Sequence, residues 1–145
     1  MLTEFWNNTS LMKRLYDRVM DPVADSYHMT RMELDILLFL ANNPTLDTAS
    51  DIIACKQLTK SHISASVKNL VAFGYLERFF ADGNRKLVHL KVLEAAAEIV
   101  EAGRKAQKEF FESLFVGFSQ DDLAVMEGFH MQMAENLRAA IKERG

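Results

Sequence analysis

Cysteine, proline and glycine are scarce in this chain of 145 residues, which contains one, two and six of them. The single cysteine, Cys55, excludes an internal disulfide and agrees with a reducing compartment. The longest purely apolar runs are a few residues, short of the roughly 20 that span a bilayer. Acidic Glu4 stands where a signal peptide would be basic. We therefore expect a cytoplasmic protein without a membrane partner.

Motifs of catalytic and metal sites are missing as well. The sequence has no Gly-x-Ser-x-Gly, no glycine-rich phosphate loop and no His-Glu-x-x-His. Its histidines are scattered without the spacing of metal ligands. We expect no enzymatic activity, no metal and no cofactor. A small cytosolic enzyme that uses a cavity between helices stays open as an alternative.

With few residues that break helices, the chain is expected to be mainly α-helical. Capping-box pairs, in which a Ser or Thr precedes an acid by three positions, indicate three helix starts. The pairs are Thr30 with Glu33, Thr48 with Asp51, and Ser119 with Asp122. Thr59 is a further N-cap, and Gly74 closes the helix that Thr59 begins. The expected helices cover residues 2–20, 31–42, 49–55, 59–73, 93–115 and 120–144.

A small β-wing interrupts this pattern after Gly74. Residues 75–80 and 86–92 are rich in aromatic and branched side chains, which favour strands. The segment 81–84, Ala-Asp-Gly-Asn, favours a hairpin turn between them. A helix pair followed by such a hairpin is expected to form a winged helix-turn-helix.

Positive charge is concentrated around this winged segment. Between Lys56 and Lys91 seven basic residues face two acids, a local balance of +5, while the remaining residues carry −8. An acidic protein with one basic face is typical of a module that binds duplex DNA.

The fourth helix has the pattern of a DNA-reading helix. Ile63, Val67, Leu70 and Val71 recur at helical spacing and form a stripe that is expected to be buried. Small, polar and basic residues between positions 60 and 68 lie toward the other side, where they can reach phosphates and base edges. A solvated amphipathic helix without a partner is the alternative.

Residues 58–64, Leu-Thr-Lys-Ser-His-Ile-Ser, and residues 74–78, Gly-Tyr-Leu-Glu-Arg, resemble two motifs of one family. These motifs are the recognition helix Leu-Ser-Lys-Ser-x-Val-Ser and the Gly-Leu-Val-Glu-Arg that ends it in the MarR family of bacterial winged-helix transcription factors. The layout also resembles the family along nearly the entire chain. The resemblance implies one domain over 1–145, with dimerisation helices at 1–28 and 93–145 and a winged helix-turn-helix at 29–92.

The resemblance further implies a homodimer on double-stranded DNA with a pseudo-palindromic operator. Two recognition helices would enter successive major grooves, and two wings would enter flanking minor grooves. The residues expected to contact DNA are Thr59, Lys60, Ser61, His62, Ser64, Ala65, Lys68, Arg85 and Lys86.

The wing departs from the family pattern. Asp82 is usually followed two positions later by Arg, but here Asn84 stands at that spacing and Arg85 comes one residue further on. Lys91 replaces a threonine, and Ala65 replaces a position that is often Arg. Contact with the minor groove is therefore assigned to Arg85. Ala65 leaves the recognition helix less basic than is usual in the family, and DNA binding is expected to depend steeply on salt.

Both ends of the chain support the dimer. The first helix is apolar over a broad surface from Leu2 to Met20, and the C-terminal arm repeats this from Phe110 to Ile141. A monomer would expose much of this area, which normally marks an interface. Packing of the same stripes within one chain is the alternative.

The resemblance also implies a small amphipathic or phenolic effector between the dimerisation helices and the winged helix. The residues expected to line its site are Tyr16, Met20, Tyr27, His28, Met32 and Phe39. Plain core packing is the alternative for each of them. Cys55, near the end of the third helix, is expected to be a buried small apolar residue rather than a redox switch.

The function that these features favour is a homodimeric DNA-binding repressor that an effector releases. A protein-interaction adaptor on the same scaffold, without sequence-specific DNA binding, is the alternative. Its support is the net charge of −3 and a fourth helix without arginine.

Overall fold

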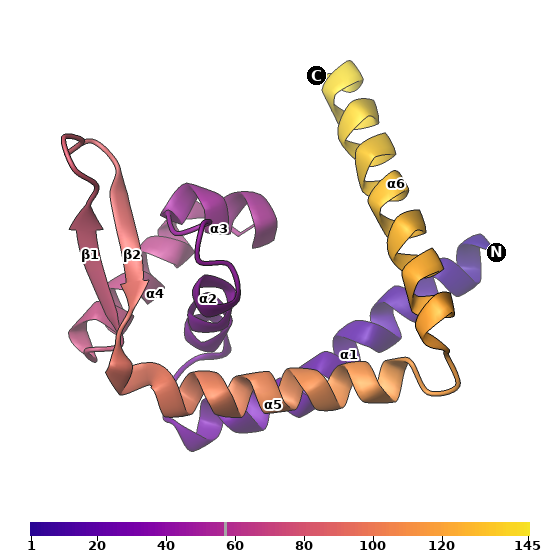
Figure 1. Ribbon diagram of the computed structural model, residues 1–145, viewed down its shortest axis with the longest axis horizontal. Helices are drawn as coiled ribbons and strands as arrows, with labels where there is room; N and C mark the ends of the chain where they lie inside the picture. The colour runs from indigo at the N-terminus through magenta and orange to yellow at the C-terminus, as the bar shows by residue number, and fades with distance from the viewer. Residues whose placement is uncertain (57) are drawn as a thin grey trace. The chain divides into compact units, whose positions relative to one another are not determined.

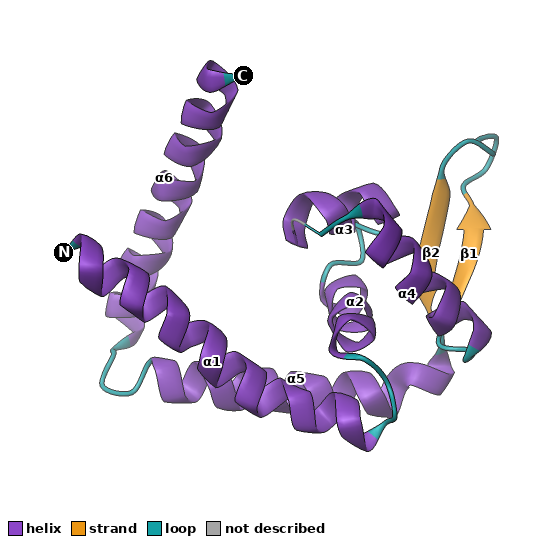
Figure 2. Ribbon diagram, turned by 180° about the vertical axis from the view of Figure 1, so that it is seen from behind, coloured by secondary structure: helices purple, strands orange, loops and turns teal. Residues whose placement is uncertain are grey.

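The computed structural model describes residues 1–56 and 58–145 and divides them into two compact units, Met1–Phe111 and Glu112–Gly145. The second unit contains the last residues of α5 and the helix α6 (Gln120–Arg144). The first unit is a winged helix with long helices on one side (Figures 1 and 2). Its elements are α1 (Leu2–Ser26), α2 (Arg31–Asn42), α3 (Ala49–Lys56), α4 (Lys60–Ala72), β1 (Leu76–Phe80), β2 (Val88–Val92), a 3-10 turn (Glu94–Ala96) and α5 (Ala97–Leu114).

The expected helix starts are confirmed by their hydrogen bonds. At α2 the Thr30 N–H donates to Glu33 Oε1 at 2.8 Å, and the Glu33 N–H donates to Thr30 Oγ1 at 3.1 Å. The same reciprocal pair joins Thr48 to Asp51 at the start of α3 and Ser119 to Asp122 at the start of α6. These local pairs satisfy backbone donors that the first turn of a helix leaves free.

Several boundaries differ from the sequence prediction, most of all the end of the first helix. The first helix does not end near residue 20 but continues through Pro22 to Ser26. Proline removes one helical hydrogen bond, but the burial of Ala24 and the packing of Val23 on the core offset this loss. The second strand begins at Val88 rather than at residue 86, because residues 81–87 form an exposed loop.

The burial expected for Cys55 is wrong. Its side chain is exposed near the end of α3. This helix has only eight residues, and Ile52 is the residue that it buries. Ile53 packs partly against the core, but the residues after it in α3 are exposed, and the thiol faces solvent.

The core of the first unit is built around α2. Leu34, Ile36, Leu37 and Leu38 are almost completely buried there, together with Met20 of α1. Gly103 brings α5 so close to α2 that an added Cβ would lie 2.7 Å from both methyl groups of Leu38. Both ribbon views show α5 running along α1 (Figures 1 and 2).

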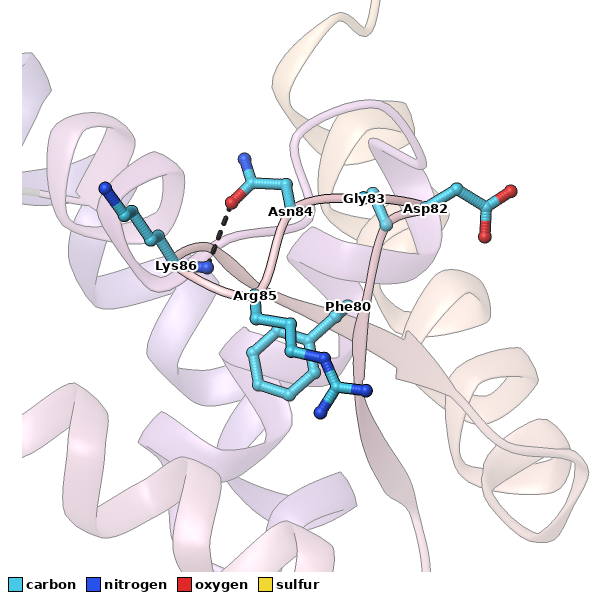
Figure 3. Close-up of a pocket in the computed structure, with 7 residues that line it drawn as sticks. Phe80, Asp82, Gly83, Asn84, Arg85 and Lys86 are labelled. Carbon is cyan, nitrogen blue, oxygen red and sulfur yellow. Dashed lines mark hydrogen bonds between the residues drawn. The ribbon is translucent and has the colours of Figure 1, made fainter.

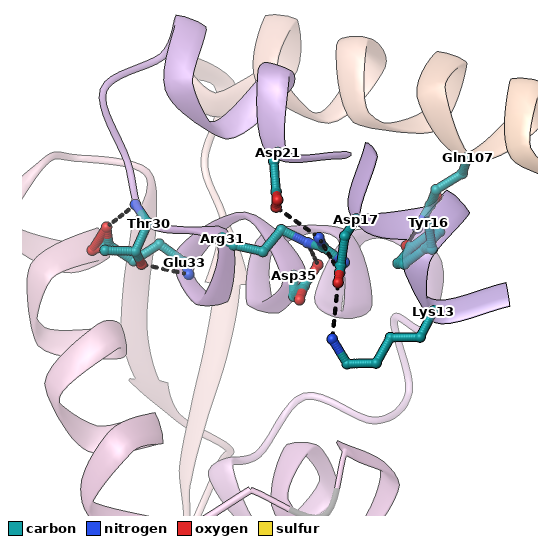
Figure 4. Close-up of polar contacts among 9 residues, drawn as sticks. All are labelled: Lys13, Tyr16, Asp17, Asp21, Thr30, Arg31, Glu33, Asp35 and Gln107. Atoms are coloured by element: carbon teal, nitrogen blue, oxygen red, sulfur yellow. Dashed lines mark hydrogen bonds and ion pairs between the residues drawn. The ribbon is translucent and has the colours of Figure 1, made fainter. Parts of the chain in front are cut away.

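A polar cluster joins α1 to α2 beside this core (Figure 4). The Arg31 guanidinium donates to carboxylates of Asp17, Asp21 and Asp35, each at 2.9 Å. Burial alone would lower the pKa of Arg31, but the hydrogen bonds to Asp35, Asp21 and Asp17 raise it above its ordinary value. The cluster therefore holds a permanent cation where the two helices meet.

A second set of polar contacts ties α5 to α1 and α2. Gln107 donates to the Tyr16 hydroxyl at 2.9 Å and accepts a hydrogen bond from Asn42 at 3.2 Å. Arg104 donates to the backbone carbonyl of Ala41, which is one of the last in α2. The long helices thus contact the winged part of the unit near both ends of α2.

A helix that crosses a membrane must be apolar as well as long. In the ranges 1–56 and 58–145, no helix combines the length and the hydropathy that crossing a bilayer requires.

Candidate nucleic-acid interface

Helix α4 has the amphipathic orientation that its sequence predicts. Ile63, Val67 and Leu70 are buried against the core, and Ser66 is buried beside them. Thr59 caps the helix, since its hydroxyl accepts a hydrogen bond from the His62 N–H at 3.4 Å. One face of α4 is therefore fixed to the body of the unit, and the other is free for a partner.

All nine residues expected to contact DNA lie on the surface. Seven belong to the cap and the outer face of α4, from Thr59 to Lys68, and two lie in the wing loop, Arg85 and Lys86. Ser61, Ser64 and Ala65 are short, so that a groove wall can approach the helix backbone closely.

The cations of this surface are not neutralised by neighbouring acids. Within the described residues, no carboxylate forms an ion pair with Lys60, Lys68, Arg85 or Lys86. By contrast, the carboxylates of Asp17, Asp21 and Asp35 are engaged by Arg31. The basic face therefore keeps its full charge for an anionic partner.

A short connection fixes α4 relative to the hairpin. The Gly74 N–H donates to the Val71 carbonyl and the Tyr75 N–H to the Leu70 carbonyl, both at 3.0 Å. Gly74 adopts φ +81°, a left-handed conformation that side chains disfavour. The hairpin thus leaves the end of the helix in a defined direction.

The wing loop is stabilised by its own turn (Figure 3). The Asn84 N–H donates to the Ala81 carbonyl at 3.1 Å, and Gly83 adopts φ +75°. The Asn84 side chain accepts a hydrogen bond from the Lys86 N–H at 2.9 Å. The residue that departs from the family pattern therefore organises the loop, and Arg85 comes directly after it.

The loop surrounds a hollow of about 750 Å³. In Figure 3, Arg85 and Phe80 lie on one side of the loop, whereas Asp82 points away from them. Arg85 is exposed and lines this hollow together with Phe80, which is 49% exposed. The tip of the wing thus presents a cation and an aromatic surface together.

Sequence reasoning missed residues at the base of the wing. Arg78 lines a hollow of about 180 Å³ together with Ser64 and Val67 of α4. Strand alternation provided a signal, because Leu76, Arg78 and Phe80 share one face of β1. Asp47 and His89 also meet here, at 2.7 Å, but nothing in the local sequence connects two residues so far apart.

The six residues expected around an effector occupy different environments. Met20 and Phe39 belong to the core, whereas Tyr16, Tyr27 and Met32 are partly buried and pack against it. His28 is exposed at φ +56° after the end of α1. Three hollows in the described part of the chain, of about 750, 300 and 180 Å³, contain none of the six in their linings. An effector site at these residues stays a prediction.

Residues 28–86 match the sequence model of the MarR family. This match covers the expected winged helix-turn-helix as far as the wing loop. The resemblance inferred from the motifs of α4 is therefore confirmed. No protein in the curated set is a significant sequence match.

Solved structures share the fold at low sequence identity. A MarR family transcriptional regulator from Listeria monocytogenes, complexed with a 26mer DNA, superposes with a TM-score of 0.79 at 13% identity, over 91% of this chain and 87% of that one. The S. aureus MepR–DNA complex gives 0.71 at 17% identity, over 94% and 96%. Staphylococcus aureus MarR with salicylate and kanamycin gives 0.72 at 16%, over 94% and 92%.

Proposed function

We propose, from the premise that this is a MarR-family chain, that it is a DNA-binding transcription regulator. The match of residues 28–86 to the sequence model of the MarR family supports this, and a solved structure of a MarR family regulator shares the fold over 91% of the chain. One observation carries the proposal: all nine residues on α4 and the wing that the family pattern assigns to DNA are exposed. The cations among them have no acidic partner in the described residues.

In this function α4 enters the major groove with its N-terminal end. Lys60 and Lys68 would neutralise phosphates, and the release of counterions would supply much of the affinity. Ser64 and His62 would face base edges, and Ala65 is small enough to contact a thymine methyl. Arg85 would enter the minor groove from the wing, where the negative potential favours a guanidinium.

The regulator is proposed to act as a homodimer. Large apolar side chains are exposed along the first turns of α1, including Leu2, Phe5 and Trp6. In the second unit α6 buries none of its residues, and Phe129, Leu137 and Ile141 are among those exposed. A second copy of the chain would cover these faces, and a two-fold dimer would place two α4 helices on half-sites about 34 Å apart.

We propose that the protein represses transcription and that a small molecule relieves this repression. A dimer bound across a promoter would exclude other proteins until an amphipathic or phenolic effector changed the separation of its two α4 helices. Support comes from the partly buried Tyr16, Tyr27 and Met32, which lie where the long helices pack on α2. A neighbour of this fold, Staphylococcus aureus MarR, has been solved with salicylate.

A salt series tests the DNA-binding proposal. Binding of the purified protein to its own upstream intergenic DNA would be measured for wild type and for Lys60→Ala, Lys68→Ala and Arg85→Ala. Each phosphate contact that is removed should make the slope of log K against log salt less negative by about 0.9, so a lysine variant of the proposed homodimer, which loses two, should change it by about 1.8. Lys105→Ala is the matched control, since Lys105 is an exposed lysine on α5, outside the proposed surface.

Two results would contradict the proposal. Binding that does not respond to salt would exclude phosphate contacts as its source. Variants of the α4 and wing cations that bind like the Lys105→Ala control would assign DNA binding to another surface. Either result would overturn the proposed interface, and a protein that does not bind this DNA at all would favour the protein-interaction adaptor.

A further inference from the structure

The hairpin that carries Arg85 packs against the helices mainly at its base. Leu76 and Leu90 are buried and hold its base, but every residue from Glu77 to Val88 is exposed. A two-stranded sheet is only marginally stable by itself in water. Something besides the buried base must therefore hold the wing at a fixed angle.

Asp47 contacts the hairpin through both its main chain and its side chain. Its carbonyl accepts a hydrogen bond from the Leu90 N–H at 2.8 Å. Its carboxylate lies 2.7 Å from Nδ1 of His89, and because an ionised carboxylate only accepts, the imidazole donates. In the part of the chain that the structure describes, this is the one side-chain hydrogen bond that joins the hairpin to the rest of the unit, at the loop before α3.

The pair is sheltered and aligned by its neighbours. The side chains of His89 and Asp47 are only 19% and 23% exposed. Phe79, the cross-strand partner of His89, stacks on the imidazole with the ring centres 5.3 Å apart and the planes at 27°. Such shielding strengthens a charge-assisted hydrogen bond. Asp47 also precedes Thr48, the cap of α3, so that one short segment positions both α3 and the wing.

Because of the position of His89 along β2, a small change of angle at this residue would move the wing tip by a larger distance. His89 is followed toward the tip by Val88 and then by the exposed loop with Arg85 and Lys86. At about 3.3 Å per residue, Arg85 lies at most about 13 Å beyond His89. A tilt of about 10° at His89 would then displace the guanidinium by about 2 Å, enough to break a hydrogen bond.

We propose that Asp47 and His89 are positioning residues that set the angle of the wing and so place Arg85 and Lys86 on DNA. The proposal rests on the DNA-binding function above. It assigns neither residue a contact with DNA. Their loss should weaken binding only as far as the wing cations contribute to it.

A double-mutant cycle tests this dependence. His89→Phe keeps a ring that can stack on Phe79 but removes the Nδ1 donor. DNA binding should weaken about fivefold or more in the wild-type background, and less than about twofold when Arg85→Ala and Lys86→Ala are already present. His130→Phe, the same change at an exposed histidine of α6, is the matched control and should bind like wild type.

Amide hydrogen exchange of the free protein provides a readout without DNA. The Leu90 N–H, which donates to Asp47, should exchange faster in His89→Phe than in wild type, while amides in the middle of α2 stay protected. If His89→Phe does not fold, Asp47→Ala enters the same cycle, because it removes the acceptor and leaves the hairpin sequence unchanged.

Equal reductions of binding in both backgrounds would overturn the proposal, since they indicate a direct contact or general destabilisation. Unchanged binding by His89→Phe, in a protein that Arg85→Ala weakens, would also overturn it. If no substitution on α4 or the wing affects DNA binding, the proposed function fails instead. In that case, hydrogen exchange of the Leu90 amide alone decides whether Asp47 and His89 hold the hairpin.

Discussion

The guanidinium of Arg31 lies over the ring of Tyr16, 4.9 Å from its centre, while its N–H groups bind three carboxylates. The Tyr16 ring contacts Arg31 of α2, and the Tyr16 hydroxyl accepts a hydrogen bond from Gln107 of α5 (Figure 4). One tyrosine therefore contacts both helices that pack on α1. These polar contacts join α1 to α2 and α5, in addition to the apolar packing around α2.

Replacing Arg31 should destabilise the first unit. Arg31→Met keeps much of the side-chain volume but leaves Asp17, Asp21 and Asp35 without their shared cation. Arg31 is 23% exposed and Asp21 is 55% exposed, so solvent screening limits the loss to about 1–3 kcal/mol. Urea unfolding measures this loss. Arg14→Met, at an exposed site on α1, the helix that carries Asp17 and Asp21, should stay within about 0.5 kcal/mol of wild type. An equal loss in both variants would refute a special role for the cluster.

Two glycine substitutions within helices should have opposite effects. Gly103→Ala would place a Cβ 2.7 Å from the methyl groups of Leu38, which is 1% exposed, so either this buried side chain or the two helices must shift. A loss of about 1–3 kcal/mol is expected despite the better helix propensity of alanine. Gly128→Ala meets no atom within 4 Å and should stabilise α6 by about 0.5–1 kcal/mol. Thermal unfolding compares the two, and stabilisation by both would show that α5 has room beside Leu38.

A charge on the exposed apolar face of α6 should disrupt self-association. Leu137 and Ile141 are 63% and 68% exposed and lie one helical turn apart. Leu137→Glu would put a carboxylate into any dimer interface that covers this face, and it should shift the protein toward monomer in sedimentation velocity at micromolar concentration. Glu135→Gln is the control on the same helix. A wild-type protein that sediments as a monomer would refute the proposed dimer itself.

Acid should weaken the start of α6. The backbone N–H of Ser119, and then its side chain, lower the pKa of Asp122 below its ordinary value of 3.8. The ionised carboxylate therefore favours the folded helix above pH 3.8, and this contribution is lost as the pH falls through the lower pKa of the folded state. Carbon NMR of the carboxyl group should show a midpoint below 3.8. In a pH series, Asp122→Ala should differ from wild type at neutral pH and converge with it in acid; a midpoint at or above 3.8 would contradict this.

Local interactions were the most predictable part of the fold. The capping pairs at Thr30, Thr48 and Ser119 join residues three positions apart, so the sequence alone identifies both partners. The buried stripe of α4 follows from helical spacing in the same way. The orientation of the nine expected DNA contacts could be predicted for this reason, because each follows from the helix period or from a tight turn.

Interactions across the fold could not be predicted. Asp47 and His89 are 42 positions apart, and Arg31 meets Asp17 over 14 positions, with no periodic pattern between them. Cys55 was expected to be buried because cysteine usually is, but burial depends on what lies opposite the end of α3. Likewise, Pro22 favours a helix end unless the following turn gains buried surface, as it does through Ala24.

The short turn at Gly74, between α4 and β1, limits the changes in length that the chain tolerates. Because side chains alternate along β1, one residue inserted between Gly74 and Leu76 would turn Arg78 and Phe80 to the opposite face and expose Leu76. The exposed loop between Phe80 and Val88 has no such alternation and should accept additional residues. An insertion scan through one short hairpin should therefore pass from intolerant to tolerant positions within a few residues.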